Sequence, residues 1–285
     1  MLSDVVDLLR CPHCRLQMQL HARVLRCGSG HSFDVARQGY VNLLPGRPAT
    51  GTGDTPAMVA ARTSFLAGDH FAHFADAVAT ATSDRPYGFD GSDVRPGEPI
   101  AEIGAGTGYY LAHALRRREG VGVAVDVSTA AARRAAHAHE RIGSVVADAW
   151  TSLPLADACL GAAVVAFAPR SGGELARVVR PGGRLVVLVP GADHLAELRT
   201  HLGLLAVDPR KAERLAAALG DAFRPESDDT LRWTTELDHD AVRNLVLMGP
   251  NALHQDQRRL TEAIAALPER TPVTVSGILH VLRRR

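Results

Sequence analysis

The chain has 285 residues, a formal net charge of +1, 46% hydrophobic residues and 22% charged residues. This composition is typical of a globular protein with a full hydrophobic core, and it excludes a protein that binds nucleic acid through a high overall positive charge. Lys211 is the only lysine, so the other basic residues are arginines. A near-zero net charge is still compatible with a local basic patch.

The N-terminus predicts neither a signal peptide nor a membrane anchor. Asp4 and Asp7 interrupt its apolar residues. The most apolar runs, Leu160–Phe167 and Leu185–Val189, fall well short of the roughly 18 to 20 residues of a membrane span. Three of the four cysteines lie within Cys11–Cys27. Because a secreted disulfide framework spreads its cysteines in pairs, we expect a protein of the reducing cytoplasm.

Three regions are expected along the chain. Residues 1–44 form a small basic module, since the first 50 residues carry six arginines and three aspartates. Residues 45–97 begin with the linker-like stretch Pro45–Pro56 and continue with predicted helices over 57–66 and 71–81, which are expected to line the site. Residues 98–285 form the main domain.

The main domain is predicted to alternate strands and helices. Strands are expected at 99–103, 121–127, 145–147, 162–168 and 184–189, and helices at 109–118 and 129–139. Beyond Leu195 the pattern is mainly helical, with a β-rich segment at 272–282. Near-continuous apolar strands separated by helices indicate an α/β fold, a doubly wound and mostly parallel sheet covered on both faces.

A metal-ligand pattern lies in the first region. Cys11-Pro-His-Cys14 is followed by Cys27-Gly-Ser-Gly-His31, and two close pairs of soft donors on tight turns are how a tetrahedral zinc site is assembled. We predict a closed, structural zinc site made by Cys11, Cys14, Cys27 and His31. His13 is a competing ligand, and the alternative is that these residues are incidental.

A glycine-rich loop follows the first strand of the main domain. In Glu102-Ile-Gly104-Ala-Gly106-Thr-Gly108, the third glycine of a dinucleotide fingerprint is replaced by Tyr109, and the Gly-Lys of a Walker loop is missing. The loop therefore predicts a compact ligand other than NAD or ATP, held by exposed backbone N–H groups. The alternative is an ordinary tight turn.

Three carboxylates are placed around that loop. Asp126 ends the second strand, where it can accept hydrogen bonds from ribose hydroxyls; Asp148 follows the third strand near the position of an adenine; and Glu102 ends the first strand near a charged amino-acid group. With the later turn Arg180-Pro-Gly-Gly-Arg184, this pattern resembles the class I S-adenosylmethionine-dependent methyltransferases. The resemblance implies a Rossmann-like fold with S-adenosylmethionine as cofactor.

Further blocks narrow the resemblance. With the Cys/His pairs, the segments 33–36, 39–44, 53–58 and 248–250 resemble the RlmA family of 23S rRNA (guanine-N1-)-methyltransferases, in its tylosin-resistance branch. This implies methyl transfer from S-adenosylmethionine to N1 of one guanine in hairpin 35 of 23S rRNA, and a homodimer. It also implies cofactor contacts at Gly106, Thr107 and His194, with Phe71 in place of a family tyrosine. A helix cap is the alternative for His194.

The predicted RNA contacts are arginines. Arg37, Arg47 and Arg62 are candidates for the RNA backbone and Arg170 for the acceptor side, although each is alternatively an exposed solubilising charge. Because Glu102, Asp126 and Asp148 are predicted to bind the cofactor, no general base is assigned. Deleting residues 1–44 is expected to abolish rRNA methylation and to leave cofactor affinity largely intact.

Two other functions fit part of the pattern. One is a small-molecule methyltransferase of antibiotic metabolism, in which the zinc module is a lid. The other is a non-catalytic, zinc-bearing rRNA-binding factor. The basic zinc module argues against the first, and the intact glycine loop with Asp126 argues against the second.

Overall fold

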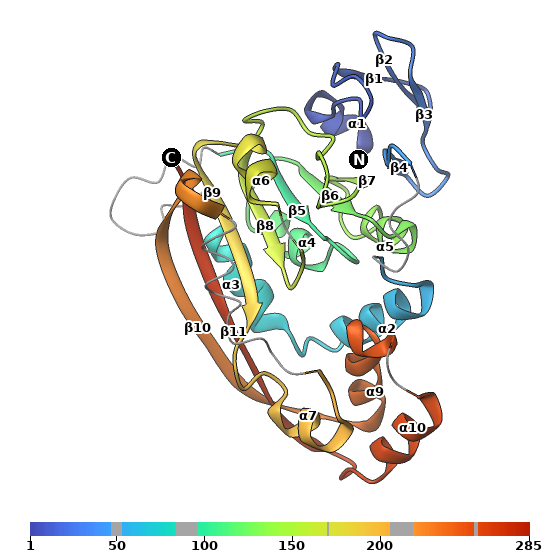
Figure 1. Cartoon of the computed structure of the whole chain (residues 1–285), viewed down its shortest axis with the longest axis vertical. Helices are drawn as coiled ribbons and strands as arrows, with labels where there is room; N and C mark the ends of the chain where they lie inside the picture. The colour runs from blue at the N-terminus through green and yellow to red at the C-terminus, as the bar shows by residue number, and fades with distance from the viewer. Residues whose placement is uncertain (47–52, 84–95, 170, 206–218, 254–255) are drawn as a thin grey trace.

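A computed structural model describes residues 1–46, 53–83, 96–169, 171–205, 219–253 and 256–285 of the chain. Its centre is an eight-stranded mixed sheet with the order β10-β11-β9-β8-β5-β6-β7-β4 (Figure 1). The bounds of these strands are β4 Tyr40–Asn42, β5 Ile100–Ile103, β6 Gly122–Asp126, β7 Ile142–Val146, β8 Leu160–Ala166, β9 Val179–Pro190, β10 Phe223–Leu237 and β11 Thr271–Arg284.

The strands from β9 to β4 are parallel to one another, whereas β11 is antiparallel to both β9 and β10. The parallel strands are apolar because helices cover both faces of the sheet, and every residue of β8 is buried. The predicted α/β fold with a mostly parallel sheet is thereby confirmed.

The helices α2, α3, α4 and α5 lie close to the four ranges predicted for helices, whereas no range was predicted for the other helices. The bounds of the helices are α2 Pro56–Ala67, α3 Ala72–Ala81, α4 Tyr109–Arg116, α5 Thr129–Ala135, α6 Gly172–Val178, α7 Ala196–Leu202, α9 His239–Leu247 and α10 Gln257–Ala265, with short 3-10 turns η2 Gly220–Ala222 and η3 Pro250–Leu253. Helix α5 ends earlier than predicted, because the N–H groups of His137 and Ala138 bond three residues back and tighten the chain into turns.

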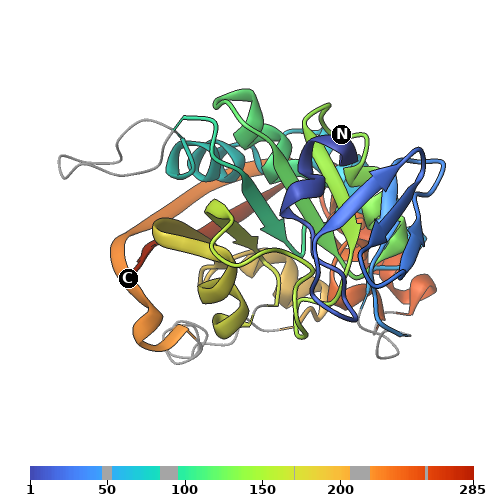
Figure 2. The ribbon, with the colours of Figure 1, turned by 90° about the horizontal axis from the view of Figure 1, so that it is seen from above.

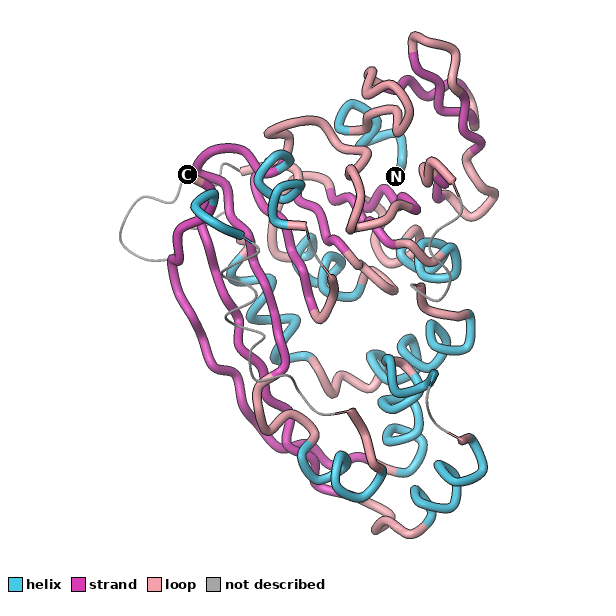
Figure 3. The backbone as a smooth tube through the Cα atoms, viewed as in Figure 1, coloured by secondary structure: helices cyan, strands magenta, loops and turns pink. Residues whose placement is uncertain are grey.

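Strand β10 was not predicted from the sequence. It pairs with β11 along its whole length, and the two long antiparallel strands lie at one end of the sheet (Figure 3). Its outward positions carry polar side chains such as Arg232 and Glu236, and its inward positions include Asp229 and Thr235 as well as Trp233. The sequence of β10 therefore lacks the alternation of apolar and polar residues that is typical of a half-buried strand. The turn Arg180–Arg184 also differs from expectation, because it lies within β9.

The first residues form a second, three-stranded sheet, β1 Met18–His21, β2 Val24–Cys27 and β3 Ser32–Asp34, beside α1 Leu2–Val5 and η1 Val6–Leu8. This small sheet lies at the β7 end of the main sheet, opposite β10 (Figure 2). Val5 and Leu9 are fully buried in the same core as Val145 and Leu155 of the main domain. The Arg15 guanidinium donates to the carbonyls of Leu153 and Leu155 at 2.7 and 2.9 Å.

The last strand of the predicted module, β4, is part of the main sheet, since Tyr40–Asn42 pairs in parallel with β7. The chain thus crosses from the small sheet into the large one before residue 44. Residues 1–44 are joined to the main domain by a continuous core and by a strand.

Candidate functional site

Two cavities open where the parallel strands β5, β6 and β8 end. The smaller has a volume of about 140 Å³ and is lined by Asp126, Asp148 and Trp150. The larger, of about 450 Å³, is lined by Glu102, Thr107 and His194 among others. Both share the residues Arg62, Gly104, Gly106, Ala166 and Phe167. The two cavities therefore meet over the glycine loop.

The structure brings together nearly all of the residues that were predicted to bind the cofactor. The larger cavity contains Phe71, Glu102, Gly104, Gly106, Thr107 and His194, and the smaller contains Gly104, Gly106, Asp126 and Asp148. Gly108 is the exception. It caps α4 at φ +76°, and a Cβ there would lie 3.2 Å from the Cα of Ala135. Gly108 allows α4 to pack closely on α5 and lines neither cavity.

Gly104 lets two loops approach each other. Its φ is +72°, and a Cβ at this position would lie 2.4 Å from the Cβ of Ala168, which follows β8. Only glycine fits this contact without displacing the backbone that carries Phe167–Pro169. The segment Phe167–Pro169 is thus held against the glycine loop.

Asp126 fixes the shape of the glycine loop. Its Oδ2 accepts from the Gly106 N–H at 2.7 Å, and its Oδ1 accepts from the Ser128 N–H at 2.8 Å. Burial raises the pKa of this carboxyl above its ordinary value, although the two N–H donors act in the opposite direction. The same carboxylate faces the smaller cavity, where the sequence predicted an acceptor for ribose hydroxyls.

Glu102 is buried at the end of β5, and its Oε2 accepts from the Leu111 N–H at 3.0 Å. Burial raises the pKa of Glu102 to about 8, against the opposing effect of that N–H donor. At neutral pH the group is therefore mostly protonated. A cationic ligand group beside Glu102 lowers the pKa of this carboxyl, so Glu102 releases its proton when such a group binds.

Aromatic rings form one wall of the larger cavity. The rings of Phe167 and His194 are nearly parallel with centroids 6.0 Å apart, and the Phe71 ring lies 6.0 Å from that of His194. The Nδ1 of His194 accepts from the Ser276 N–H at 3.2 Å, so a neutral His194 carries its proton on Nε2. Phe167 itself has φ +53°, a strained conformation for a residue with a side chain.

The predicted RNA-binding arginines fall in different places. Arg37 is exposed on the small module. Arg62 is partly buried, and its Nη2 donates to Asp54 and to the carbonyl of Met248, both at 2.7 Å. The RNA backbone contact of Arg62 stays a prediction. Arg47 and Arg170 lie outside the described residues.

Several cavity residues were not singled out by the sequence analysis. Asp54 and Trp150 line the smaller cavity, and Tyr110 and Asn251 line the larger one. Asp54 and Asn251 lie in or next to the segments 53–58 and 248–250, so the family blocks contained a signal. Trp150 follows Asp148 by two residues, and its exposure of 63% marks it as a surface aromatic.

The chemistry of the cavities fits S-adenosylmethionine. Carboxylates in the smaller cavity can accept from the ribose hydroxyls. The aromatic wall of the larger cavity suits the sulfonium cation, because ring faces attract positive charge.

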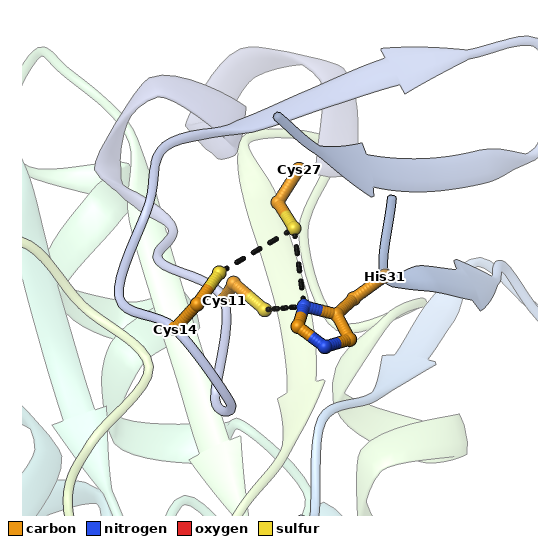
Figure 4. A group of neighbouring side chains, drawn as sticks. All are labelled: Cys11, Cys14, Cys27 and His31. Carbon is orange, nitrogen blue, oxygen red and sulfur yellow. Dashed lines mark hydrogen bonds between the residues drawn. The ribbon is translucent and has the colours of Figure 1, made fainter. Parts of the chain in front are cut away.

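The four predicted metal ligands converge (Figure 4). The three Sγ atoms and the Nδ1 of His31 all lie within 4.8 Å of one another. The Cys14–Cys27 Sγ distance is 3.5 Å, and His31 Nδ1 lies 3.5 and 3.4 Å from the Sγ atoms of Cys11 and Cys27. A tetrahedral site with metal–ligand bonds of about 2.0 to 2.3 Å has edges of about 3.5 to 3.8 Å.

The competing ligand His13 is not part of this cluster. Its ring packs on those of His31 and Phe33, with centroids 5.0 and 5.9 Å away. Four protein donors close the coordination shell, so the site fits a structural zinc ion with no position for a reacting water.

Together, the sheet, the glycine loop and the joined cavities define an S-adenosylmethionine-dependent methyltransferase with a zinc-binding module. Residues 9–48 match the zinc-ribbon family model described as "RlmA, N-terminal", and residues 101–187 match the one described as "Methyltransferase domain".

The chain is similar over almost its whole length to curated proteins. It is 47% identical to the "Putative 23S rRNA (guanine-N(1)-)-methyltransferase" of Micromonospora griseorubida, over 99% of this chain and 98% of the relative. It is 45% identical to the "23S rRNA (guanine(748)-N(1))-methyltransferase" of Streptomyces fradiae, over 99% of both chains. A Bacillus subtilis relative is 28% identical over 90% of each chain. The chain belongs to the RlmA family of 23S rRNA (guanine-N1-)-methyltransferases, which confirms the resemblance found in the sequence.

Among the described residues, no helix combines the length and the apolar character needed to cross a membrane.

Proposed function

We propose that the chain transfers a methyl group from S-adenosylmethionine to N1 of a single guanine in hairpin 35 of 23S rRNA. The observation that carries this proposal is the identity of 47% and 45%, over almost the full length, to relatives whose names give guanine-N1 methylation of 23S rRNA. The Streptomyces fradiae relative is named for guanine 748, and we propose the equivalent guanine as the target.

The chain's own residues divide the work between the two cavities. Asp126 and Asp148 bind the adenosine part of the cofactor, and the loop at Gly104–Gly108 fixes its direction. The bound cofactor supplies an electrophilic methyl group on a sulfonium. Phe71, Phe167 and His194 form the wall beside the sulfonium and exclude water from the reacting atoms, and a flipped guanine enters the same cavity. Bound there, the cofactor would supply its methyl group to N1 of the guanine: the sulfur–methyl bond would be exchanged for a nitrogen–methyl bond, and the N1 proton would pass to solvent.

The zinc ion holds the small module in shape, and the module presents Arg37 to the RNA. Because the module shares a core with the main domain, it is a fixed RNA-binding surface. This supports a ribosomal RNA substrate over a small metabolite, for which a basic module has no use.

The test is methylation of unmodified 23S rRNA with labelled S-adenosylmethionine. A methyl group on N1 blocks base pairing, so primer extension on the product is expected to stop at one guanine in hairpin 35. Gly104→Ala is expected to abolish the stop, and Arg258→Ala, an exposed arginine paired with Glu262 on α10, is expected to retain it. Label in a small metabolite alone, or RNA binding without transfer, would support the two alternative functions instead.

Three further proposals follow from family membership. We propose that the modification protects the ribosome against tylosin-type macrolides, that the enzyme works in the cytoplasm, and that it is a homodimer. Protection is tested by comparing the macrolide sensitivity of a deletion strain with that of the same strain carrying the restored gene. Cell fractionation tests the location, and sedimentation equilibrium tests the oligomeric state.

A further inference from the structure

Arg62 occupies a central position that methyl transfer, as described above, does not use. It is one of the residues that line both cavities. Its Nε and Nη2 donate to Asp54 Oδ2 at 3.2 and 2.7 Å, and Nη2 also donates to the Met248 carbonyl at 2.7 Å. The side chain is only 26% exposed. The guanidinium is thus held by two segments that are far apart in the sequence.

The side chain of Arg62 lies across the glycine loop. A Cβ at Gly106 would lie 3.3 Å from the Cδ of Arg62 and 3.5 Å from its Nε. This is the place where the two cavities meet. A ligand with its adenosine part in one cavity and its amino-acid part in the other must pass directly beside this guanidinium.

The charges around the cavities indicate what Arg62 can bind. Asp54, Asp126 and Asp148 line the smaller cavity, and Glu102 lines the larger one. An acidic surrounding repels a ligand carboxylate unless a cation is supplied. Of the described arginines, Arg62 and Arg199 line these cavities, and Arg199 lines only the larger one, with its Nη2 donating to the Ala192 carbonyl.

We propose that Arg62 binds the carboxylate of the cofactor's amino-acid arm, and that Asp54 holds the guanidinium in place until the cofactor arrives. The planar fork of an arginine suits a carboxylate, and the Met248 carbonyl keeps one edge of the guanidinium anchored while the other changes partner. This inference rests on the proposed use of S-adenosylmethionine, but not on the RNA substrate.

The experiment compares two ligands that differ in the amino-acid arm. S-adenosylhomocysteine carries the carboxylate, whereas 5′-methylthioadenosine retains the adenosine and the sulfur but lacks the amino acid. Binding of each is measured by calorimetry on the full chain. Arg62→Ala is expected to weaken the binding of S-adenosylhomocysteine by about tenfold or more, because a charged hydrogen bond is lost. The binding of 5′-methylthioadenosine is expected to weaken by less than about twofold. Arg62→Lys is expected to fall between, because it keeps the charge without the fork.

Arg258→Ala is the control: it removes an exposed, ion-paired arginine and is expected to bind both ligands as the unmodified chain does. Asp54→Asn tests the exchange of partners. It removes the anion that the ligand carboxylate must displace, and it is expected to bind S-adenosylhomocysteine more tightly than the unmodified chain.

Three results would overturn the proposal. If Arg62→Ala lowers the affinity for both ligands equally, Arg62 only supports the loop. If it changes the affinity for neither ligand, the carboxylate binds elsewhere. If Asp54→Asn lowers the affinity for S-adenosylhomocysteine as much as Arg62→Ala does, the ion pair is purely structural. None of these outcomes depends on methylation of RNA, so failure here is distinct from failure of the proposed function.

Discussion

Glu102 is a carboxyl group whose pKa differs between the folded and the unfolded chain. Its pKa rises to about 8 in the folded chain, from an ordinary value of 4.5. Between these two values the unfolded chain releases the proton while the folded chain keeps it. The folded state then binds more protons, so this group lowers the free energy of unfolding as pH rises through that window.

Glu102→Gln removes this titration and retains an acceptor for the Leu111 N–H. We expect the variant to gain stability over the unmodified chain as pH rises from 5 to 7.5, by on the order of 3 kcal/mol. Urea unfolding at the two pH values measures the difference. The titration of the zinc ligands is common to both chains and cancels. The same difference in the free energy of unfolding between the two chains at both pH values would contradict the expected effect.

Gly104 and Gly173 form a matched pair of glycines. A Cβ at Gly104 has no room against Ala168, and its φ is positive, whereas Gly173 in α6 is exposed with nothing within 4 Å of a Cβ. Gly104→Ala is expected to lose about 2 kcal/mol or more of stability together with binding of S-adenosylhomocysteine. Gly173→Ala is expected to change stability by less than about 1 kcal/mol and to leave binding intact. Thermal unfolding and calorimetry report both properties, and similar behaviour of the two variants would count against the close contact.

At the scale of elements, the zinc ligands join the loop before β1 to the end of β2 and the start of β3. Cys11→Ser is expected to lose the metal and several kcal/mol of stability, because zinc binding is coupled to folding of the small sheet. His13→Ala is the matched control, since His13 lies between two ligands in sequence but outside the cluster. Metal analysis is expected to find one zinc ion per chain in His13→Ala and none in Cys11→Ser. Loss of zinc in both would make His13 a ligand.

The same elements change the expected result of removing the small module. Deletion of residues 1–44 takes β4 from the main sheet and exposes the core that Val5 and Leu9 share with the main domain. We expect the truncated chain to unfold or aggregate and to lose cofactor binding. This replaces the expectation from sequence, which treated the module as separable. Calorimetry on the truncated chain measures the affinity, and an unchanged value would restore the earlier expectation.

A point variant is the better test of RNA binding by the module. Arg37→Ala removes an exposed charge and is expected to weaken binding of a hairpin 35 transcript by a few fold, with a smaller salt dependence. Binding of S-adenosylhomocysteine is expected to stay the same. Arg258→Ala on α10 controls for loss of any exposed arginine. An unchanged affinity for the transcript would remove Arg37 from the RNA-binding surface.

Prediction from the sequence succeeded where local chemistry decides the structure. The spacing of Cys11–Cys14 and Cys27–His31 was enough for the metal cluster, and apolar runs such as Leu160–Ala166 were enough for the parallel strands. It failed for β10, whose polar inward side chains are stabilised by a partner strand more than thirty residues later in the chain. It also gave no indication of the Arg62–Asp54 pair, because nothing local distinguishes that arginine from an exposed one.

At the scale of the whole molecule, the small sheet and the large sheet share one hydrophobic core and form a single folded unit. The large sheet begins with β4 from the N-terminal region and ends with the antiparallel pair β11 and β10 from the C-terminal region. The cavities lie between these ends, with walls contributed by residues from Gly53 to Asn251. Cofactor binding therefore reports on the integrity of nearly the whole chain, and the small-ligand measurements above also test whether a variant has folded.

The position of β11 determines when this enzyme can be completed during its synthesis. Thr271–Arg284 is translated after β9 and β10, yet it lies between them and pairs with both. Until β11 has left the ribosome, β9 has an open edge and β10 has no partner. An unpaired, apolar strand edge is a template for aggregation, so the nascent chain is exposed to this risk from the time β9 emerges until β11 joins the sheet. An enzyme whose substrate is ribosomal RNA thus completes its central sheet only after β11 has left the ribosome that made it.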